Sequence, residues 1–248
     1  MRTFLDTIEV VLLDIDGTVL DFDACVVETM REGFCQFGLP EYEPWMFEYF
    51  KEINDILWKQ LERGEITQQE LFAVRWKRIL ERIGIAFDGS QMEQFFRQKL
   101  LNSAIPVPGA GKLLETLACR YELGVASNGP YEQQRRRLTL AGFADHFTYF
   151  FVSQRIGCAK PDPRFFKTAM NEMNEGRLRC GKPQVKPGEV LMVGDSLTSD
   201  MDGGIGFGMK TCYLDHKEAG PDGRPVDLIV HSLGELADIV TGGDSGNA

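Results

Sequence analysis

The chain has 248 residues, of which 43% are hydrophobic and 26% charged, enough for one large domain or for a core domain with an insert. Its formal net charge of -10 argues against a broad basic surface that binds nucleic-acid polymers. No apolar stretch is long enough to cross a bilayer. The six scattered cysteines, with no CxxC pair and no signal peptide, predict reduced thiols in a soluble cytoplasmic protein.

The first predicted strand, residues 8–13, is aliphatic or β-branched except for Glu9, which is typical of a strand buried on both faces. It leads into Asp14 and Asp16, which strand alternation would place close together. In parallel α/β sheets the ligand crevice lies outside the carboxyl ends of the strands. Two neighbouring carboxylates repel, so one can remain ionised as a nucleophile while the other carries a proton. An ordinary turn after a strand is the alternative.

Residues 21–103 lack strand-like runs and have helical spacing, which predicts a bundle of about four helices inserted after the first strand. We expect capping boxes at Thr67 with Glu70 and at Ser90 with Glu93. Aromatic residues are abundant here, and most of them should form the bundle core. The first two helices are expected at residues 24–37 and 45–61.

From residue 104 the chain alternates between strands and helices, which predicts an α/β fold with a doubly wound, Rossmann-like parallel sheet. The predicted domains are therefore an α/β core of residues 1–20 and 104–248 and an inserted four-helix domain of residues 21–103. The strands are expected at residues 123–126, 147–152, 190–193, 211–214 and 228–230, and the helices at 113–117, from 130, 163–173 and from 232.

For three other segments of the second half, the sequence predicts surface positions. Residues 174–188 are polar and contain Gly and Pro, which predicts a surface loop, and residues 241–248 resemble a frayed tail. Arg135, Arg136 and Arg137 are expected to form a solvated helix face.

Polar residues also follow three later strands. Ser127-Asn128-Gly129 offers a hydroxyl, an amide and a glycine whose N–H can approach an oxyanion, although helix capping would also explain the first two. Lys160, which precedes two prolines in AKPDP, could be aimed from a fixed loop or could be an ordinary solvated lysine. Asp195 and Asp200 follow the strand at 190–193, and Asp195 with Asp14 would suit Mg²⁺ unless it only caps a helix.

The order of these motifs, DxDGT, SNG, KPDP and GDSxxxD, resembles that of the haloacid dehalogenase superfamily of phosphatases over nearly the whole chain. The helical insert has the position of that family's type-1 cap. The resemblance implies that Asp14 attacks phosphorus and forms an aspartyl-phosphate, while Asp16 protonates the leaving oxygen and later deprotonates water. It also implies Mg²⁺ as cofactor, held by the Asp14 carboxylate, the Asp16 carbonyl and Asp195, while Asp200 orients Lys160 or a metal-bound water.

By the same resemblance, Ser127 and Lys160 bind the transferring phosphoryl group, assisted by Asn128 and Gly129, and Thr18 helps hold the turn and the phosphoryl group. Asp16 argues against dehalogenation, because family members that cleave carbon–halogen bonds lack this acid.

The segments TVLDFD, INDILW and RGEIT resemble the YjjG-type pyrimidine 5′-nucleotidases, although that branch often has DxDDT where this chain has DxDGT. The expected substrate is therefore a small phosphomonoester, with a pyrimidine nucleoside 5′-monophosphate favoured, and the protein is expected to be a monomer or small homo-oligomer. A phosphoglycolate or sugar-phosphate phosphatase, or a phosphoglucomutase, is the alternative within the superfamily. A catalytically silent binding protein on the same fold is the alternative outside enzymes.

Overall fold

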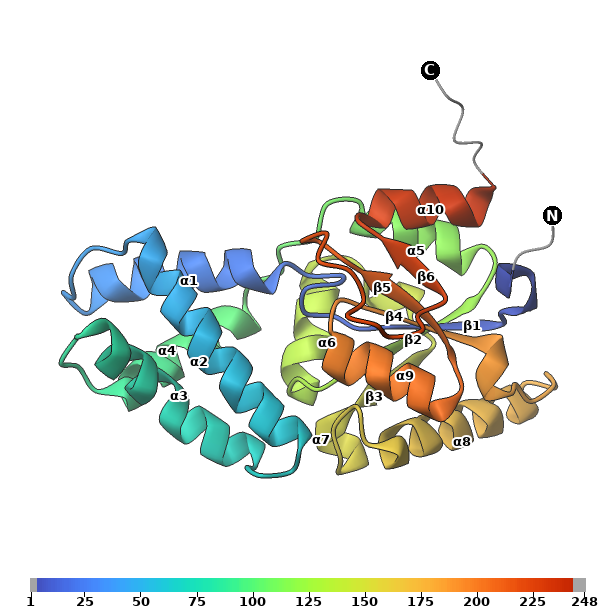
Figure 1. The fold of residues 1–248 in the computed structure, drawn as a ribbon, viewed down its shortest axis with the longest axis horizontal. Helices are drawn as coiled ribbons and strands as arrows, with labels where there is room; N and C mark the ends of the chain where they lie inside the picture. The colour runs from blue at the N-terminus through green and yellow to red at the C-terminus, as the bar shows by residue number, and fades with distance from the viewer. Residues whose placement is uncertain (1–3, 243–248) are drawn as a thin grey trace, which may run out of the picture. The chain divides into compact units, whose positions relative to one another are not determined.

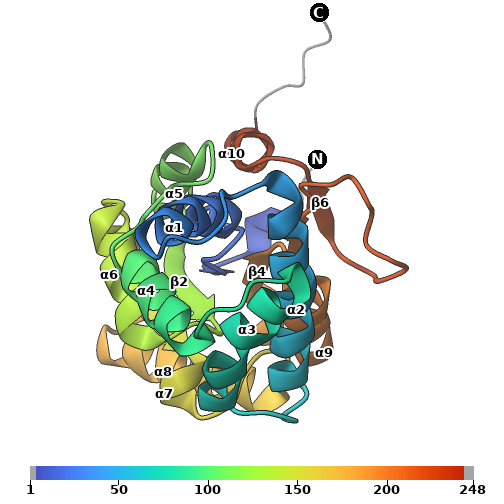
Figure 2. The same ribbon diagram turned by 90° about the vertical axis from the view of Figure 1, so that its left-hand side faces the viewer.

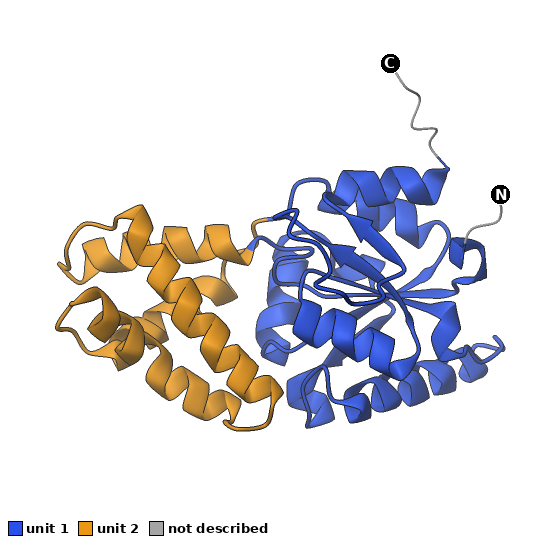
Figure 3. Ribbon diagram, viewed as in Figure 1, with its two compact units in different colours: residues 1–21, 106–248 blue, residues 22–105 orange. Residues whose placement is uncertain are grey.

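The computed structural model describes residues 4–242, and the chain divides into two compact units (Figure 1; Figure 3). Unit 1 comprises residues 1–21 and 106–248, and unit 2 comprises residues 22–105. The chain thus passes between the units after residues 21 and 105, close to the boundaries after residues 20 and 103 that the sequence pattern predicts.

A parallel sheet forms the centre of unit 1, with six strands within residues 4–242 in the order β3-β2-β1-β4-β5-β6. β1 lies between two neighbours, because Val10 pairs with Glu122 of β2 on one side and with Val190 of β4 on the other. The predicted doubly wound parallel sheet is therefore confirmed. The strands are β1 Val10–Leu13, β2 Glu122–Ser127, β3 Tyr149–Val152, β4 Val190–Gly194, β5 Lys210–Leu214 and β6 Leu228–Val230.

Helices cover both faces of this sheet (Figure 1). Alternation along β1 sends Val11 and Leu13 into a core shared with α5 and α10, while Val10 and Leu12 join a second core with α8. Burial on both faces is why this strand is an unbroken apolar run. The helices are α5 Ala110–Ala118, α6 Tyr131–Leu140, α7 Ser153–Ile156, α8 Pro163–Arg179, α9 Asp202–Phe207 and α10 Leu233–Thr241.

Short helical turns complete the described part of unit 1: η1 Phe4–Thr7, η2 Ala144–His146, η3 Pro187–Glu189 and the π-helical turn η4 Leu197–Met201. Across residues 4–242, no helix combines the length and the apolar character that a membrane span requires.

The loop predicted at residues 174–188 is wrong for its first part, because α8 continues to Arg179. Met173 is fully buried, and the guanidinium of Arg177 is buried against Glu122, with Nη1 2.9 Å from Oε1. These contacts hold the last turns of the helix on the sheet despite their polar sequence. Of the predicted tail, Thr241 ends α10, and residues 243–248 lie outside the described residues.

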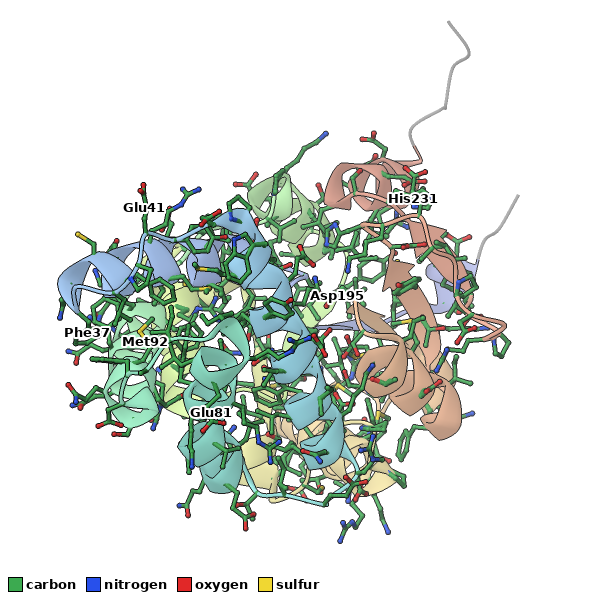
Figure 4. All side chains as sticks on the ribbon, turned by 60° about the vertical axis from the view of Figure 1, so that its left-hand side comes forward. Phe37, Glu41, Glu81, Met92, Asp195 and His231 are labelled. Carbon is green, nitrogen blue, oxygen red and sulfur yellow. The ribbon has the colours of Figure 1, made fainter. Side chains whose placement is uncertain are left out.

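Unit 2 contains four helices, which Figure 2 shows from the side of this unit: α1 Phe22–Gln36, α2 Pro44–Glu62, α3 Gln68–Ile83 and α4 Gly89–Leu101. Its core is aromatic, as expected: the rings of Phe50, Trp76 and Phe96 lie within 5.7 Å of one another, measured between centroids. In Figure 4, Phe37 and Met92 lie among the crowded side chains of this unit.

The two capping predictions in unit 2 have different outcomes. Thr67 and Glu70 form the predicted capping box at the start of α3. The box at Ser90 and Glu93 is wrong, because Asp88 caps α4 and accepts from the backbone N–H of Ser90. Glu93 is instead buried and pairs with Arg75, with Oε1 2.6 Å from Nη2. The need to pair a buried arginine outweighs the local capping pattern.

Candidate active site

Lys160 lies at the centre of a buried polar group at the carboxyl ends of the strands. Its side chain is 1% exposed, and its ammonium donates to Asp14 Oδ1 at 2.7 Å, to Asp200 Oδ1 at 2.6 Å and to the carbonyl of Ala126. A solvated lysine, the alternative considered from the sequence, is therefore excluded. A single ammonium connects the ends of β1 and β2 with the segment after β4.

Asn128 holds the backbone on which Lys160 stands. Its side-chain Oδ1 accepts from the N–H of Lys160 at 2.8 Å, and its Nδ2 donates to the carbonyl of Lys160 at 3.0 Å. Its side chain does not cap α6, whose N-cap is Pro130. The amide of SNG thus serves to position the lysine.

Asp14, Asp195 and Asp200 each offer a carboxylate oxygen within 4.8 Å of the others. Three carboxylates face one ammonium here, so ionisation of all three would leave two negative charges unbalanced. Burial raises the pKa of Asp14 well above its ordinary value, against the opposing charge of Lys160. Burial and the charge of Asp200 raise the pKa of Asp195 to about 7. Burial would lower the pKa of Lys160, but the charges of Asp14 and Asp200 outweigh it and raise that pKa.

This donor set fits a divalent cation. Carboxylate oxygens are the ligands that Mg²⁺ prefers, and a charge of +2 would balance the excess negative charge. Both carboxylate oxygens of Asp200 already accept hydrogen bonds: Oδ1 accepts from Lys160, and Oδ2 accepts from the N–H of Ser196 at 3.1 Å. Asp14 and the partly exposed Asp195, which follows β4 directly and is labelled in Figure 4, are therefore the better candidates for direct ligands.

The turn after β1 is shaped around Asp195. Gly17 has a φ of +83°, and a Cβ on it would lie 2.3 Å from Asp195 Oδ2, so both the backbone conformation and the space require glycine. Thr18 is fully buried, and its hydroxyl donates to Asp195 Oδ1 at 3.3 Å. Thr18 therefore orients the acid in this structure.

Asp16 is bound by two side chains of α6, a helix for which its sequence motif predicts no contact with this acid. Its Oδ2 accepts from Gln134 Nε2 at 2.6 Å, and its Oδ1 accepts from Arg137 Nη1. β1 ends at Leu13, and the carboxylate of Asp16 is not in the group formed by the other three acids. Asp14 and Asp16 therefore have different partners, since Lys160 holds the first and Gln134 and Arg137 hold the second.

The prediction of a solvated arginine face is wrong for Arg137, whose side chain is 0% exposed. The buried residues of α6 are Tyr131, Gln134, Arg137 and Leu138, which follow the spacing of a single helix face. In the sequence, only the spacing of Tyr131 and Leu138 marks this face, and the partners of Gln134 and Arg137 come from the tertiary structure.

Ser127 belongs to the same network as Asp16. Its hydroxyl accepts from the N–H of Gly129 at 3.1 Å and from Gln134 Nε2 at 3.0 Å. A Cβ on Gly129 would lie 2.3 Å from Gln134 Nε2, so this glycine leaves room for the glutamine. The hydroxyl expected to bind phosphate is thus two hydrogen bonds away from Asp16.

Comparisons with known proteins identify the family of this chain. A family model for haloacid dehalogenase-like hydrolases matches residues 8–208. The chain is 32% identical over 230 residues to the pyrimidine 5′-nucleotidase PynA of Streptococcus pneumoniae, covering 92% of each protein. It is 28% identical over 231 residues to the pyrimidine 5′-nucleotidase YjjG of Escherichia coli, covering 93% of this chain and 96% of YjjG.

A solved structure resembles most of the chain. The magnesium-bound crystal structure of YfnB from Bacillus subtilis has a TM-score of 0.82 and 29% sequence identity, and the match covers 94% of this chain and 99% of YfnB.

Proposed function

Because the chain belongs to the haloacid dehalogenase-like hydrolases, we propose that it is a Mg²⁺-dependent phosphomonoester hydrolase that works through an aspartyl-phosphate on Asp14. The observation that carries this proposal is the buried Lys160, which bridges Asp14 and Asp200 beside a third carboxylate. A carboxylate nucleophile can approach a dianionic phosphoryl group only where positive charge is concentrated. The ammonium of Lys160 supplies such a charge beside Asp14.

In the first step, an oxygen of Asp14 attacks phosphorus and the ester bond to the leaving oxygen breaks. Asp16 gives its proton to that oxygen, so an alcohol departs. In the second step, Asp16 takes a proton from water, whose oxygen attacks the aspartyl-phosphate and releases inorganic phosphate. Lys160 and Ser127 bind the phosphoryl oxygens, and the rigid strand ends keep these groups aligned.

Mg²⁺ would be held by the carboxylates of Asp14 and Asp195 and by the backbone carbonyl of Asp16, and when bound it supplies charge stabilisation for nucleophile and phosphoryl group. Asp200 keeps Lys160 in place through its 2.6 Å contact, and Thr18 keeps Asp195 turned toward the turn after β1. Both residues therefore act by orienting a neighbour.

The proposed substrate is a nucleoside 5′-monophosphate, with pyrimidine bases preferred. The names of PynA and YjjG, both similar to this chain over more than nine-tenths of its length, support this substrate. A phosphoglycolate or sugar-phosphate phosphatase and a phosphoglucomutase use the same core groups, so substrate turnover separates them. A silent binding protein is disfavoured, because every group that the resemblance assigns to the chemistry is present.

The test is a panel of uridine and cytidine 5′-monophosphates, purine nucleotides, phosphoglycolate and hexose phosphates, each assayed with Mg²⁺ and with EDTA. We expect phosphate release only with Mg²⁺ and fastest for the pyrimidine nucleotides. Equal or faster turnover of phosphoglycolate or hexose phosphates would contradict the nucleotidase proposal, and turnover unaffected by EDTA would contradict the role of Mg²⁺.

The covalent role is tested with Asp14→Asn. We expect a loss of roughly 10³-fold or more in kcat, because removing a nucleophile abolishes the reaction path rather than weakening it. Asp145→Asn, an exposed acid of the same unit, is the control and should retain activity. Activity that survives in Asp14→Asn would refute the aspartyl-phosphate.

We also propose a cytoplasmic location, supported by the six cysteines, all free thiols in the structure.

A further inference from the structure

Two polar side chains occupy the buried face of α6. Gln134 and Arg137 are both 0% exposed and lie one helical turn apart. Arg137 Nη1 donates to Asp16 Oδ1 and, at 3.2 Å, to Gln134 Oε1. Gln134 Nε2 donates to Asp16 Oδ2 at 2.6 Å and to the hydroxyl of Ser127 at 3.0 Å. We call Asp16, Ser127, Gln134 and Arg137 the α6 network.

We infer that Gln134 and Arg137 are positioning residues for Asp16, and that through Gln134 they fix the distance between the general acid and the phosphoryl-binding hydroxyl of Ser127. This inference rests on the proposed function. Gln134 and Arg137 thus join the motif residues as part of the site. They act on the substrate only through Asp16.

Asp16 needs such support because it lies past the end of β1, and its side chain is 29% exposed. A carboxylate in that position can rotate about two bonds, and each misplaced rotamer delays proton transfer. The two donors reach opposite oxygens of the carboxylate, so together they fix both its position and its plane. Each oxygen has a second lone-pair site, which leaves room for the proton that Asp16 transfers.

The cost of this arrangement also points to a specific role. Burying a guanidinium and an amide on a core-facing stripe is unfavourable unless both are paired, and apolar side chains would stabilise the helix at least as well. The arrangement also requires glycine at position 129, because any Cβ there would collide with Gln134. If the contacts served stability alone, they would not have to end on the acid and the hydroxyl of one site.

When Asp16 is no longer positioned, the loss of activity should depend on how much the leaving group needs a proton. An alkyl phosphate such as uridine 5′-monophosphate needs a proton on its leaving oxygen, whereas p-nitrophenyl phosphate releases a stable nitrophenolate. For Arg137→Met and Gln134→Met we expect kcat/KM to fall by about 10²-fold for uridine 5′-monophosphate, or for the alkyl ester of the panel turned over fastest, and much less for p-nitrophenyl phosphate. Arg137→Lys, which keeps the charge, should recover part of the loss.

The matched control is Arg136→Met, which removes an exposed arginine from the neighbouring position of the same helix and should leave both substrates unaffected. In an Asp16→Asn background, Arg137→Met should add little further loss, because the group it positions is already gone. If Arg137→Met does not fold, Gln134→Met provides the same comparison without the loss of a buried charge.

Equal losses for both substrates, or a full additional loss in the Asp16→Asn background, would overturn the positioning role in an enzyme that is otherwise active. A wild-type protein without Mg²⁺-dependent phosphatase activity would overturn the proposed function and this inference together. The two failures are therefore distinguishable in one set of assays.

Discussion

Of the three clustered acids, Asp195 is the one that Lys160 does not contact directly. Thr18 gives it one hydrogen bond, whereas Lys160 is shared between Asp14 and Asp200. Burial raises the pKa of Asp195 to about 7, from an ordinary value of 3.8. In the metal-free protein, this acid therefore holds a proton between these two pH values that the unfolded chain has already released.

The extra proton in the folded state decides whether stability rises or falls with pH. Since the folded state binds more protons than the unfolded state in this range, the contribution of Asp195 to stability falls as the pH rises from 3.8 toward 7. We expect the thermal midpoint in EDTA to decline less over this range in Asp195→Asn than in the wild type. Midpoints measured by circular dichroism across the range test this, and parallel curves for the two proteins would contradict it.

The same proton competes with Mg²⁺ for Asp195. The gain in thermal midpoint on adding Mg²⁺ should therefore be larger on the alkaline side of 7 than on the acid side, and small at both in Asp195→Asn.

At the scale of single elements, local contacts determine where α3 begins, whereas long-range contacts determine which side chains α6 buries. The start of α3 follows from adjacent residues, since the Thr67 side chain accepts from the N–H of Glu70 and the Glu70 carboxylate accepts from the N–H of Thr67. The buried polar face of α6 instead depends on Asp16, which lies more than a hundred residues earlier in the chain. Only the first kind of contact is visible as a short motif.

The α3 cap can be tested separately from the active site. Thr67→Ala removes the cap and should destabilise unit 2 by about 1 kcal/mol. All three tryptophans, Trp45, Trp58 and Trp76, lie in unit 2, so denaturation followed by tryptophan fluorescence reports on this unit. Gln69→Ala, exposed on the same turn, is the control, and an unchanged midpoint in Thr67→Ala would show that the cap contributes no stability.

At the scale of the whole molecule, the two units have separate cores, and the proposed metal ligands all belong to unit 1. A cation that binds the folded form stabilises the part of the protein that holds it, by mass action. We therefore expect Mg²⁺ to slow amide hydrogen exchange in residues 14–20 and 194–201 and to leave the core of unit 2, around Trp76, unchanged.

Asp195→Asn is the control for that measurement and should lose the protection in both segments of unit 1. Equal protection of unit 2 in the wild type would mean that the units unfold together, contrary to their division into two cores.

The fold was largely predictable because its signals are local. Apolar runs at residues 190–193 and 228–230 predicted strands, and the strand-helix alternation predicted the parallel sheet. The short turn at 197–201 and the length of α8 were not predictable in this way, because both depend on contacts with other segments. Arg177, for example, holds the end of α8 by binding Glu122 of β2.

The amino-acid sequence by itself determined the chemistry of the strand ends: acids, a hydroxyl and a lysine in an order that resembles one hydrolase family. Only the tertiary structure decided which of these groups meet. It brought Lys160 between two acids, and it placed Gln134 and Arg137 on Asp16 across 118 and 121 residues of chain. The physical reason is that a buried charge takes whichever partner the packing brings near, and sequence spacing carries no record of such long-range pairs.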